Sequence, residues 1–530
     1  MTDGSMQSYA LTLDKVLTHA AKWHPRAEVV TARDGGEAIR IGYADLADRS
    51  RRISGVLKSL GTGFGARVAT LAWNSQAHME AWYAIMGMGA VCHTLNPRLH
   101  PDQIAWMLGR SGARILIVSA DLVPLARQVA DRAAGLERLL VIDGDTEESA
   151  AGRPAIQQLE PLLEACEDRP AWGGFDEASP CGLCFTSGTT GDPKGVTFTH
   201  RSSFLHAQRL LQVDAMAVSG SDAVLAVVPM FHANAWGLPF AAPAAGARLV
   251  LPGRHNDGPS LARLIRAEGV TTAVGVPTVW LGLLEHLEST GTVVPSLKRI
   301  VVGGAPMPAA LMARLEDRLG ARVQTTWGMT ELSPSGTVTP LSDPVRPAAN
   351  SGRPTLGVDL LITDPEGRPL PEQRNVEGAL RVRGSAVVER YFGESQTALD
   401  ADGWFDTGDL ARIDEIGNLI ITGRAKDLIK SGGEWINPVE IEAVVGALPQ
   451  VSLAAVIGRA DAKWGERPLL LVELREAGEV TDEALLAPLK GKVAPWWIPD
   501  GVVRLSSMPL AATGKIDKIR LRSEYGGAAP

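Results

Sequence analysis

Cysteine is scarce in this sequence, which excludes a disulfide framework and a cysteine zinc centre. The 530 residues contain only four cysteines, Cys92, Cys166, Cys181 and Cys184. Cys181 and Cys184 form a C-x-x-C pair, but no second pair accompanies them, as a zinc site would require. We therefore predict that all four are reduced residues of the core.

The sequence also lacks a basic block and an uninterrupted apolar run. The sequence has 52 Lys and Arg against 60 Asp and Glu, a net charge of −8. It therefore lacks the cluster of positive charge that binding to a nucleic acid would need. The longest apolar stretch, residues 236–252, contains prolines, glycines and Arg248, so we predict no integral membrane segment. There is no N-terminal charged-then-apolar signal, and we expect a cytoplasmic protein.

Strand and helix patterns alternate along most of the chain, which predicts an α/β fold of stacked layers. Hydrophobic residues make up 45% of the sequence and charged residues 21%, a composition typical of several folded domains. Strands are expected at 67–73, 90–95, 114–118, 181–185, 223–228, 270–276, 299–302 and 322–326. Helices are expected at 76–89, 101–112, 261–268 and 308–319.

Two changes of composition predict smaller units after these layers. Residues 366–414 combine short strands with many Gly and Pro turns, which indicates a β-rich subdomain. After Gly423 a charged turn leads into Gly432-Gly433 and a helix that begins at Pro438. We predict a large N-terminal domain over 1–423, a hinge over 424–428, and a small mobile α+β C-terminal domain over 429–530.

The loop at residues 186–195 is built to hold a polyphosphate. Its small residues let backbone N–H groups converge on an anion, its hydroxyls add donors, and Lys194 adds a positive charge. A Walker A loop is excluded, because Pro193 precedes the lysine and Gly195 follows it. The candidate phosphate-binding residues are Thr186, Ser187, Gly188, Thr189, Thr190 and Lys194.

This loop resembles the signature of the adenylate-forming superfamily, which includes acyl-CoA synthetases, nonribosomal peptide synthetase adenylation domains and beetle luciferases. Ten consecutive residues fit that signature. The resemblance implies that ATP, Mg²⁺ and coenzyme A are used. It also leaves a homodimer open, since some related fatty acyl-CoA synthetases are homodimers.

A second motif ends a predicted strand and offers oxygen ligands to Mg²⁺. Glu331 supplies a carboxylate beside the Thr330 hydroxyl, and Mg²⁺ usually takes one or two carboxylates. The stretch resembles the Tyr-Gly-x-Thr-Glu motif of the superfamily, with Trp327 in the tyrosine position. Trp327 keeps a stacking surface for adenine but lacks the phenol hydroxyl. The resemblance adds Thr186 to Glu331 as a metal ligand and catalytic residue.

A carboxylate in the turn Thr407-Gly408-Asp409 suits the ribose of a nucleotide. One ionised carboxylate can accept two hydrogen bonds from a cis-diol, so Asp409 is a ribose candidate. Arg424 would meet ribose or phosphate oxygens, by resemblance to the superfamily. The same resemblance assigns to ATP or AMP binding Gly304, Ala305, Pro306, Thr326, Trp327, Gly328, Met329 and Thr330.

Lys515 is the candidate for mobile positive charge in the reaction. Attack of a carboxylate on the α-phosphate brings two anions together, and a lysine on a glycine-containing loop can neutralise them. Thr513-Gly514-Lys515 resembles the catalytic-lysine motif of the superfamily, and Lys426 falls at the position of the family hinge. The resemblance implies that the C-terminal domain rotates between adenylation and thioester formation.

The resemblance also assigns residues to a coenzyme A site, namely Gly432, Gly433, Glu434, Trp435, Trp464 and Trp496. Small residues suit a narrow channel for a thiol. Trp464 and Trp496 match positions where some relatives stack the CoA adenine. Apolar Ile498 replaces the basic partner expected beside Trp496.

The segment that begins Phe231-His232 indicates the class of acid. Amino-acid adenylation domains usually place an aspartate after this phenylalanine to pair with the substrate ammonium, whereas this chain has His232. With Trp236 and the apolar residues after it, the segment favours an uncharged organic chain. The predicted acyl pocket comprises Phe231, His232, Trp236, Val302, Gly303 and Gly328.

These motifs predict a carboxylic acid–CoA ligase that makes an acyl-AMP and then an acyl-CoA. The His-x-Asn-Ala-Trp pattern resembles bacterial medium- and long-chain fatty acyl-CoA synthetases, in which the tryptophan gates the acyl tunnel, and methylmercaptopropionate-CoA ligases. Aryl or arylpropanoate acids fit the same walls. Two alternatives stay open: acylation of a phosphopantetheine carrier protein, and a nucleotide-binding regulatory protein without catalysis.

Overall fold

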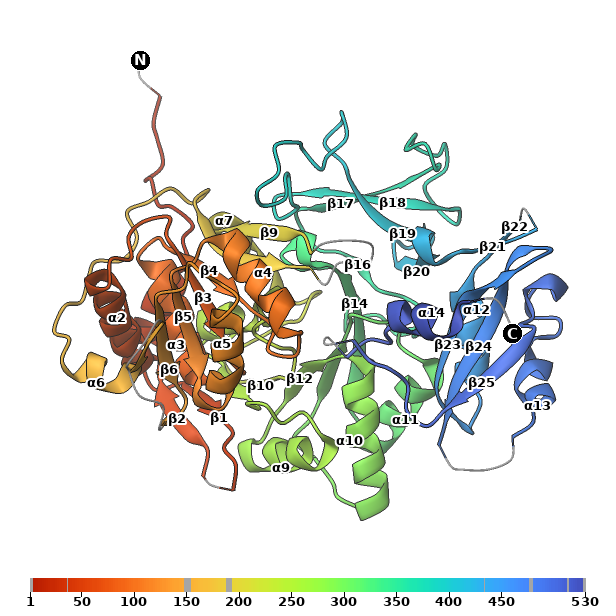
Figure 1. Cartoon of the computed structure of the whole chain (residues 1–530), viewed down its shortest axis with the longest axis horizontal. Coiled ribbons are helices and arrows are strands. Elements are labelled where there is room, and N and C mark those ends of the chain that lie inside the picture. Colours follow the sequence, from red (N-terminus) through yellow and green to blue (C-terminus); the bar gives the residue numbers. More distant parts are fainter. Residues whose placement is uncertain are drawn as a thin grey trace.

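The molecule is a large layered α/β body with a smaller domain at its C-terminal end (Figure 1). The computed structural model describes residues 3–35, 37–146, 154–186, 193–432, 434–475, 480–511 and 514–527. Within these residues, no helix is both long enough and apolar enough to cross a membrane. The predicted fold class is confirmed.

The first sheet has seven strands in the order β7-β6-β5-β3-β4-β8-β9. All neighbours are parallel except β8 and β9, which pair antiparallel across the phosphate loop. The strands are β3 (Arg67–Leu71), β4 (Val91–Thr94), β5 (Ile115–Ser119), β6 (Arg138–Ile142), β7 (Ala155–Gln158), β8 (Pro180–Phe185) and β9 (Gly195–Thr199).

The second sheet has nine strands in the order β16-β15-β14-β13-β12-β10-β11-β1-β2. Its six central strands are parallel, and β2 at one end and β15 and β16 at the other run antiparallel to their neighbours. The strands are β1 (Glu28–Thr31), β2 (Ile39–Gly42), β10 (Ala223–Ala226), β11 (Arg248–Leu251), β12 (Thr272–Gly275), β13 (Arg299–Val302), β14 (Arg322–Gly328), β15 (Ser335–Val338) and β16 (Arg353–Pro354).

Helices cover both faces of the two sheets because successive strand residues point to opposite sides. On β10, Val224 and Ala226 join the apolar cluster between the sheets, while Leu225, and Val227 directly after the strand, join a cluster on the outer side. The central helices are α1 (Asp14–Trp23), α2 (Tyr43–Ser59), α3 (Gln76–Gly87), α7 (His200–Leu210) and α8 (Leu238–Ala245). The outer helices are α4 (Pro101–Ser111) and α5 (Val123–Ala130) on the first sheet, and α9 (Gly258–Glu268), α10 (Pro277–Thr290) and α11 (Ala309–Leu319) on the second; α6 (Leu159–Glu164) packs near α2.

Two smaller sheets complete the molecule. An antiparallel sheet in the order β17-β18-β19-β20 contains β17 (Val358–Thr363), β18 (Glu377–Gly384), β19 (Phe405–Ile413) and β20 (Leu419–Arg424). The C-terminal domain has the strands β21 (Ile429–Ser431), β22 (Glu434–Ile436), β23 (Val451–Asp461), β24 (Gly465–Leu474) and β25 (Gly501–Leu505), with the helices α12 (Pro438–Gly446), α13 (Asp482–Leu486) and α14 (Lys518–Tyr525).

Most predicted elements lie within a few residues of their observed bounds, but two predictions need correction. The β-rich part is larger than 366–414, because β17 begins at Val358 and β20 closes the sheet at Arg424. The cysteines are all unpaired, as predicted, but Cys166 is only half-buried while the other three are buried. Cys166 lies in the segment that crosses helix α2 rather than in a strand.

Because that segment packs closely on α2, alanine substitutions at two helical glycines should change the stability of the protein in opposite directions. A Cβ on Gly55 would lie 2.2 Å from the Asp168 carbonyl oxygen, whereas a Cβ on Gly109 in α4 would meet nothing within 4 Å. Gly55→Ala should destabilise the protein by roughly 1–3 kcal/mol through overpacking. Gly109→Ala should stabilise it by up to about 1 kcal/mol through helix propensity. Denaturant unfolding of both variants tests this, and two stabilised variants would contradict the close approach.

Candidate functional site

The loops that follow parallel strands of the nine-stranded sheet meet at one edge of that sheet. Trp236 follows β10, Val276 follows β12, Gly304 follows β13, and Trp327 lies at the end of β14. In open parallel sheets, ligands bind outside the carboxyl ends of the strands. The predicted adenylate and acyl residues therefore share the edge at which chemistry is expected.

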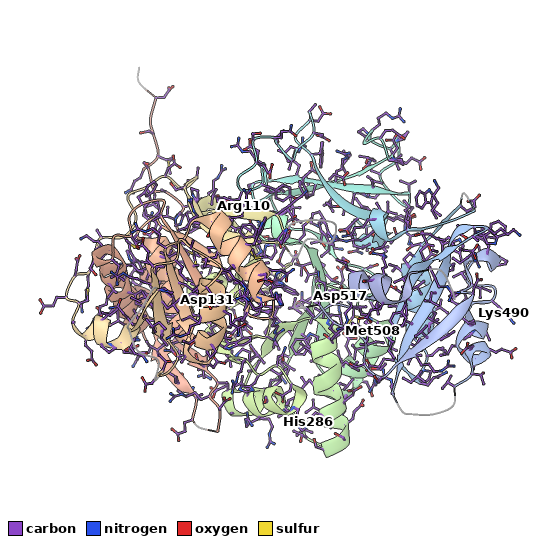
Figure 2. All side chains as sticks on the ribbon, in the orientation of Figure 1. Arg110, Asp131, His286, Lys490, Met508 and Asp517 are labelled. Carbon is purple, nitrogen blue, oxygen red and sulfur yellow. The ribbon has the colours of Figure 1, made fainter. Side chains whose placement is uncertain are left out.

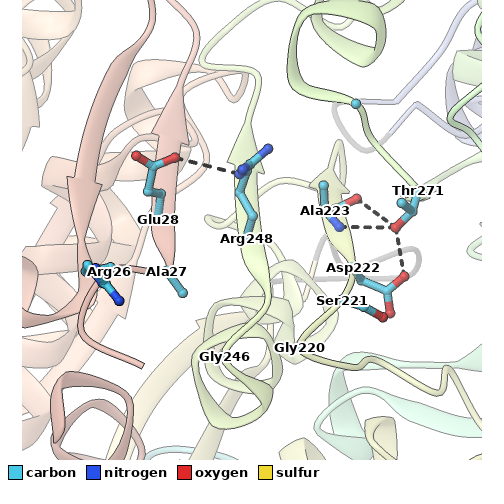
Figure 3. A pocket seen from close by; sticks show the side chains of 11 residues that line it. Arg26, Ala27, Glu28, Gly220, Ser221, Asp222, Ala223, Gly246, Arg248 and Thr271 are labelled. Atoms are coloured by element: carbon cyan, nitrogen blue, oxygen red, sulfur yellow. Dashed lines mark hydrogen bonds and ion pairs between the residues drawn. The ribbon is translucent and has the colours of Figure 1, made fainter. Parts of the chain in front are cut away.

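An open pocket of about 520 Å³ lies at the opposite ends of the strands (Figure 3). Ala223 begins β10, Arg248 begins β11, and Thr271 precedes β12. Three of the charged side chains in the pocket have partners there: Thr271 Oγ1 donates to Asp222 Oδ1 at 2.7 Å, and Arg248 Nε lies 3.7 Å from Glu28 Oε2. We place no predicted site residue in this pocket.

Lys515 reaches the strand-end edge from the C-terminal domain. It lies in a tight loop between β25 and α14, where Ala511 N–H donates to the Lys515 carbonyl at 2.7 Å. Thr278 Oγ1 of α10 donates to the Gly514 carbonyl at 3.1 Å and fixes this loop on the large domain. The Lys515 Cε is 3.4 Å from the point where a Cβ on Gly304 would lie. Figure 2 shows Asp517, two residues later, in the middle of the molecule.

The charge of Lys515 is partly desolvated at this position. Burial is the largest cause that lowers the pKa of Lys515, to about 8, and the positive charge of Arg424 lowers it further. The carboxylates of Asp409 and Glu331 act in the opposite direction. The structure thus brings together three predicted residues, Lys515, Asp409 and Glu331, which are far apart in the sequence.

Asp409 is 2% exposed and is held by two donors. Arg424 Nε lies 2.7 Å from Oδ1, because Asp409 on β19 and Arg424 on β20 are opposite each other in the ladder. Trp327 Nε1 donates to Oδ2 at 2.9 Å. Burial raises the pKa of Asp409, and Arg424 and the Trp327 hydrogen bond oppose that rise. Trp327 lacks the hydroxyl of the tyrosine found in the superfamily motif, but its indole N–H makes a hydrogen bond to Asp409 that the motif does not predict.

Glu331 is 8% exposed, and the Tyr391 hydroxyl donates to its Oε1 at 3.0 Å. The ammonium of Lys194 lies 4.8 Å from the centroid of the Tyr391 ring. Tyr391 thereby connects the predicted metal ligand with the phosphate loop. No sequence motif points to Tyr391, because it lies far along the chain from both motifs and no fixed spacing relates it to them.

The base of the phosphate loop is closed by backbone contacts. Thr186 N–H donates to the Lys194 carbonyl at 2.9 Å, and Lys194 N–H donates to Thr186 Oγ1 at 3.3 Å. The predicted residues Ser187, Gly188, Thr189 and Thr190 lie outside the described residues. Both described ends of the loop adjoin the antiparallel strands β8 and β9.

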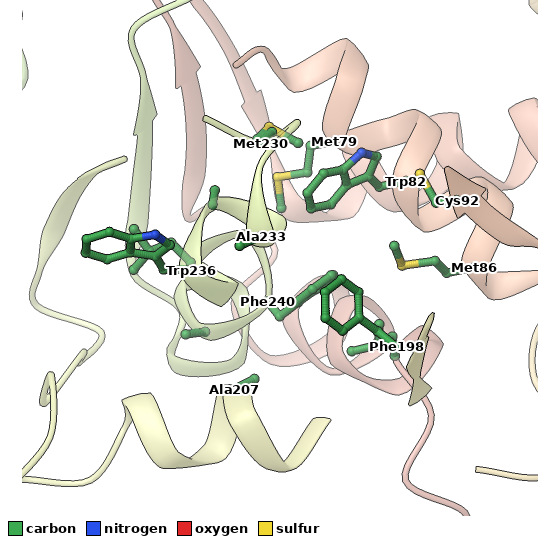
Figure 4. Close-up of a cluster of buried hydrophobic side chains, with 14 of the residues drawn as sticks. Met79, Trp82, Met86, Cys92, Phe198, Ala207, Met230, Ala233, Trp236 and Phe240 are labelled. Atoms are coloured by element: carbon green, nitrogen blue, oxygen red, sulfur yellow. The ribbon is translucent and has the colours of Figure 1, made fainter. Parts of the chain in front are cut away.

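Trp236 lies in a left-handed turn at the junction of the predicted acyl and nucleotide residues. Ala233, Asn234, Ala235 and Trp236 have φ between 44° and 54°, although none is glycine. This conformation costs roughly 1–2 kcal/mol per residue and needs support from packing. A Cβ on Gly303 would lie 3.0 Å from the indole ring. Trp236 and Phe240 lie on opposite sides of this turn (Figure 4).

His232 is partly buried in the segment after β10 and is close enough to Lys515 for that charge to act on its imidazole. Burial lowers the pKa of His232 to about 4, and the charge of Lys515 lowers it further. His232 is therefore a neutral imidazole at physiological pH, which is consistent with an acyl wall that carries no counter-charge.

The remaining predicted nucleotide and acyl residues follow the same strands. Phe231 follows β10, and its ring lies 6.2 Å from that of Trp73, edge to face. Val302 ends β13, with Gly303, Gly304, Ala305 and Pro306 after it; Thr326, Trp327 and Gly328 end β14, with Met329 and Thr330 after it.

The predicted CoA residues form a separate group on the C-terminal domain. Gly432 N–H donates to the Trp464 carbonyl at 2.8 Å, and the Trp464 ring covers Gly432. Trp435, Trp464 and Trp496 are 54%, 45% and 51% exposed. Between these described residues and Lys515 we find no hydrogen bond or ion pair. Gly433 lies outside the described residues, and Glu434 is exposed.

Position 498 has an isoleucine in place of the expected basic residue, but an arginine on a nearby strand lies beside Trp496. Arg467 on β24 donates to the Trp496 carbonyl at 2.6 Å and to the Ile498 carbonyl at 3.2 Å. Arg467 is also paired with Asp500 at 2.7 Å. A cation is thus present beside Trp496, although the sequence near the tryptophan does not reveal it.

Lys426 is exposed in the short turn that links β20 to β21. Its neighbour Asp427 is bound by Arg522 of α14, 2.7 Å away. Although the residue as a whole is exposed, partial desolvation of its ammonium and the charge of Arg424 lower the pKa of Lys426.

Comparison with known proteins identifies both parts of the chain. Residues 17–392 match the family described as AMP-binding enzyme, and residues 440–515 match its C-terminal domain. A 3-methylmercaptopropionyl-CoA ligase of Ruegeria lacuscaerulensis is 40% identical, with 99% of each chain covered. A medium-chain-fatty-acid–CoA ligase of Ectopseudomonas oleovorans is also 40% identical, over 99% of this chain and 97% of its own.

Solved structures agree with this relationship at the level of the fold. The anthranilate CoA ligase AuaEII with anthranoyl-AMP superposes with a TM-score of 0.88 at 24% identity, covering 98% of each chain. ATP-bound MatB from Rhodopseudomonas palustris gives a TM-score of 0.85 at 26% identity, covering 98% of this chain and 99% of its own. The chain therefore belongs to the adenylate-forming AMP-binding enzyme family.

Proposed function

We propose that this protein is a carboxylic acid–CoA ligase that forms AMP and acts on an apolar organic acid, such as a medium- or long-chain fatty acid. The observation that carries the proposal is the position of Lys515 between Gly304, Asp409 and Glu331 at the strand-end edge. It puts a lysine ammonium near a ribose candidate and a metal-ligand candidate. Because the reaction consumes ATP and CoA, we place it in the cytoplasm.

In the first step, an oxygen of the acid carboxylate attacks the α-phosphorus of ATP, and pyrophosphate leaves. Lys515 neutralises the two anions as they approach. Asp409 holds the ribose hydroxyls, and Lys194 with Thr186 holds the phosphates. Mg²⁺, bound by Glu331 and Thr186, would supply charge neutralisation to the leaving pyrophosphate. Tyr391 orients Glu331 for that role.

In the second step, the CoA sulfur attacks the acyl carbon, AMP leaves, and the thiol proton passes to water. We propose that residues 1–423 form the adenylate domain and 429–530 a mobile domain, with the hinge at Lys426 within 424–428. Rotation would withdraw Lys515 and bring Gly432 and Gly433 to the acyl-AMP. Trp464 and Trp496 are the proposed stacking surfaces for the CoA adenine.

Pyrophosphate release with a panel of acids, followed by acyl-CoA detection, tests the overall proposal. Equal acylation of coenzyme A and of a phosphopantetheine carrier protein would leave the natural acceptor undecided between the two thiols. Binding of ATP without pyrophosphate release for any acid would instead favour a regulatory protein.

Lys515→Ala should separate the two half-reactions. Loss of the charge at the α-phosphate should slow acyl-AMP formation by on the order of 10²–10³-fold. Given synthetic acyl-AMP, the same variant should form acyl-CoA at a rate close to wild type. Single-turnover measurements of both steps test this.

Two further variants serve as controls for that experiment. In the wild-type enzyme without bound ligands, we expect acyl-AMP formation to fall as pH rises through about 8, because Lys515 then loses its charge. Lys515→Arg keeps its charge over this range, so acyl-AMP formation by this variant should not show that fall. Lys426→Pro should spare acyl-AMP formation and hinder thioester formation, since it fixes φ at the hinge. Equal loss of both half-reactions in folded Lys515→Ala and Lys426→Pro would refute rotation.

Tyr391→Phe should weaken the response to Mg²⁺ while keeping the ring beneath Lys194. Removal of an outer hydrogen bond to a metal ligand typically costs 10–100-fold in metal affinity, and we expect a shift of about that size in the Mg²⁺ titration. Glu331→Gln, which loses the ligand charge, should shift it further. Wild-type Mg²⁺ dependence in both variants would remove Glu331 from the metal site.

Trp236→Ala should change the choice of acid without changing ATP use. The indole lies between Gly303 and the left-handed turn, so its loss should enlarge the acyl pocket and alter kcat/KM ratios among acids. Because losing a buried tryptophan can cost roughly 3–5 kcal/mol, folding is first checked by thermal unfolding. A folded variant with the wild-type acid profile would exclude a gate at Trp236.

A further inference from the structure

Arg209 on α7 carries a buried charge without a partner among the described residues. The residue is 4% exposed, and none of its three guanidinium nitrogens has a hydrogen-bond partner. Burial lowers the pKa of Arg209 to about 10, so the group stays protonated at neutral pH. An uncompensated buried cation is strongly unfavourable unless a ligand supplies the missing anion.

The helix that carries Arg209 forms the wall behind Trp236. On α7, His206 Nδ1 and Leu210 Cδ1 lie 2.5 Å and 3.3 Å from the point where a Cβ on Gly237 would lie. Trp236, the residue before that glycine, contacts Gly303 on the side of the reacting groups. Figure 4 shows the helix of Ala207 running beside this turn. Arg209 is three residues beyond His206 and lowers the pKa of that imidazole.

A second buried polar atom without a partner occurs on the sheet that encloses the same apolar cluster. Gln324 on β14 is fully buried, and its Nε2 donates to the carbonyls of Ala215 and Thr339 at 3.0 and 2.9 Å. Its Oε1 has no partner. Gln324 shares a strand face with Thr326 and lies about 6–7 Å deeper along β14. Ala215 follows α7 closely, so Gln324 binds the segment next to Arg209.

We propose that the far end of the acyl site binds a second carboxylate, and that the preferred substrate is a dicarboxylic acid whose distal group is held by Arg209. This inference rests on the proposed CoA-ligase activity, keeps the apolar chain of the acid, and replaces its uncharged far end with a second carboxylate. A guanidinium and a carboxylate form two parallel hydrogen bonds, which suit a buried, rigid site. The first carboxylate would react at Lys515, and the apolar chain between the two would lie along Trp236.

The test measures kcat/KM by pyrophosphate release for straight-chain monocarboxylic acids of increasing length and for dicarboxylic acids of the same lengths. With the wild-type protein, we expect the dicarboxylic acid to exceed its monocarboxylic counterpart by about 10- to 100-fold at the length that reaches Arg209. Arg209→Met, which keeps the volume and removes the charge, should abolish that advantage. The KM for ATP should not change.

A matched control comes from the same helix. Arg201 lies at the exposed start of α7, with its Nε 3.5 Å from Glu177 Oε1. Because this arginine is on the surface and already paired, Arg201→Met should keep the wild-type preference for dicarboxylic over monocarboxylic acids. Arg209→Lys should retain part of it, because the charge remains without the paired geometry. If Arg209→Met does not fold, the wild-type ratio of dicarboxylic to monocarboxylic acid and the Arg209→Lys variant still decide the question.

The outcomes separate this inference from the proposed function. Preference of the wild-type protein for monocarboxylic acids at every length would overturn the inference and leave the ligase intact. Preference for acids with a terminal hydroxyl over those with a terminal carboxylate would also overturn it. Pyrophosphate release with none of the acids would count against the proposed function itself.

Discussion

One buried carboxylate connects three parts of the molecule. Asp409 is almost inaccessible to water, and an unpaired charge there would cost several kcal/mol. Its donors come from β20 through Arg424 and from β14 through Trp327, and the charge of Lys515 arrives from the C-terminal domain. The β-rich sheet, the nine-stranded sheet and the C-terminal domain are therefore positioned around the same charge.

The contacts that hold the C-terminal domain are of a weaker kind. Thr278 donates to the Gly514 carbonyl, and Arg475 pairs with Glu285 at 3.3 Å, with both of those charged side chains partly exposed. Exposed ion pairs contribute about 0–1 kcal/mol and are screened by salt. Such contacts are strong enough to hold Lys515 in place for the proposed acyl-AMP formation and weak enough to permit the rotation that we propose for the second half-reaction.

The sequence predicts the layers and most of the candidate site because both depend on local patterns. Alternating apolar runs give strands such as β13 within the predicted limits, but Thr407-Gly408-Asp409, which we expected to form a turn, lies within strand β19. Contacts between distant segments leave no such pattern. The hydrogen bonds from Tyr391 to Glu331 and from Trp327 to Asp409 join residues 60 and 82 positions apart, and only the folded chain reveals them.

The acyl side of the site combines two features that are unfavourable for stability alone. The left-handed turn from Ala233 to Trp236 costs free energy at each residue, and the charge of Arg209 is buried behind it. Gly237 lets the turn pack directly on α7, because a side chain there would collide with His206. Both the strained turn and the buried charge lower the stability of the folded protein without a ligand. Their presence at the candidate acyl site fits a role in binding, because a bound substrate could offset this loss of stability.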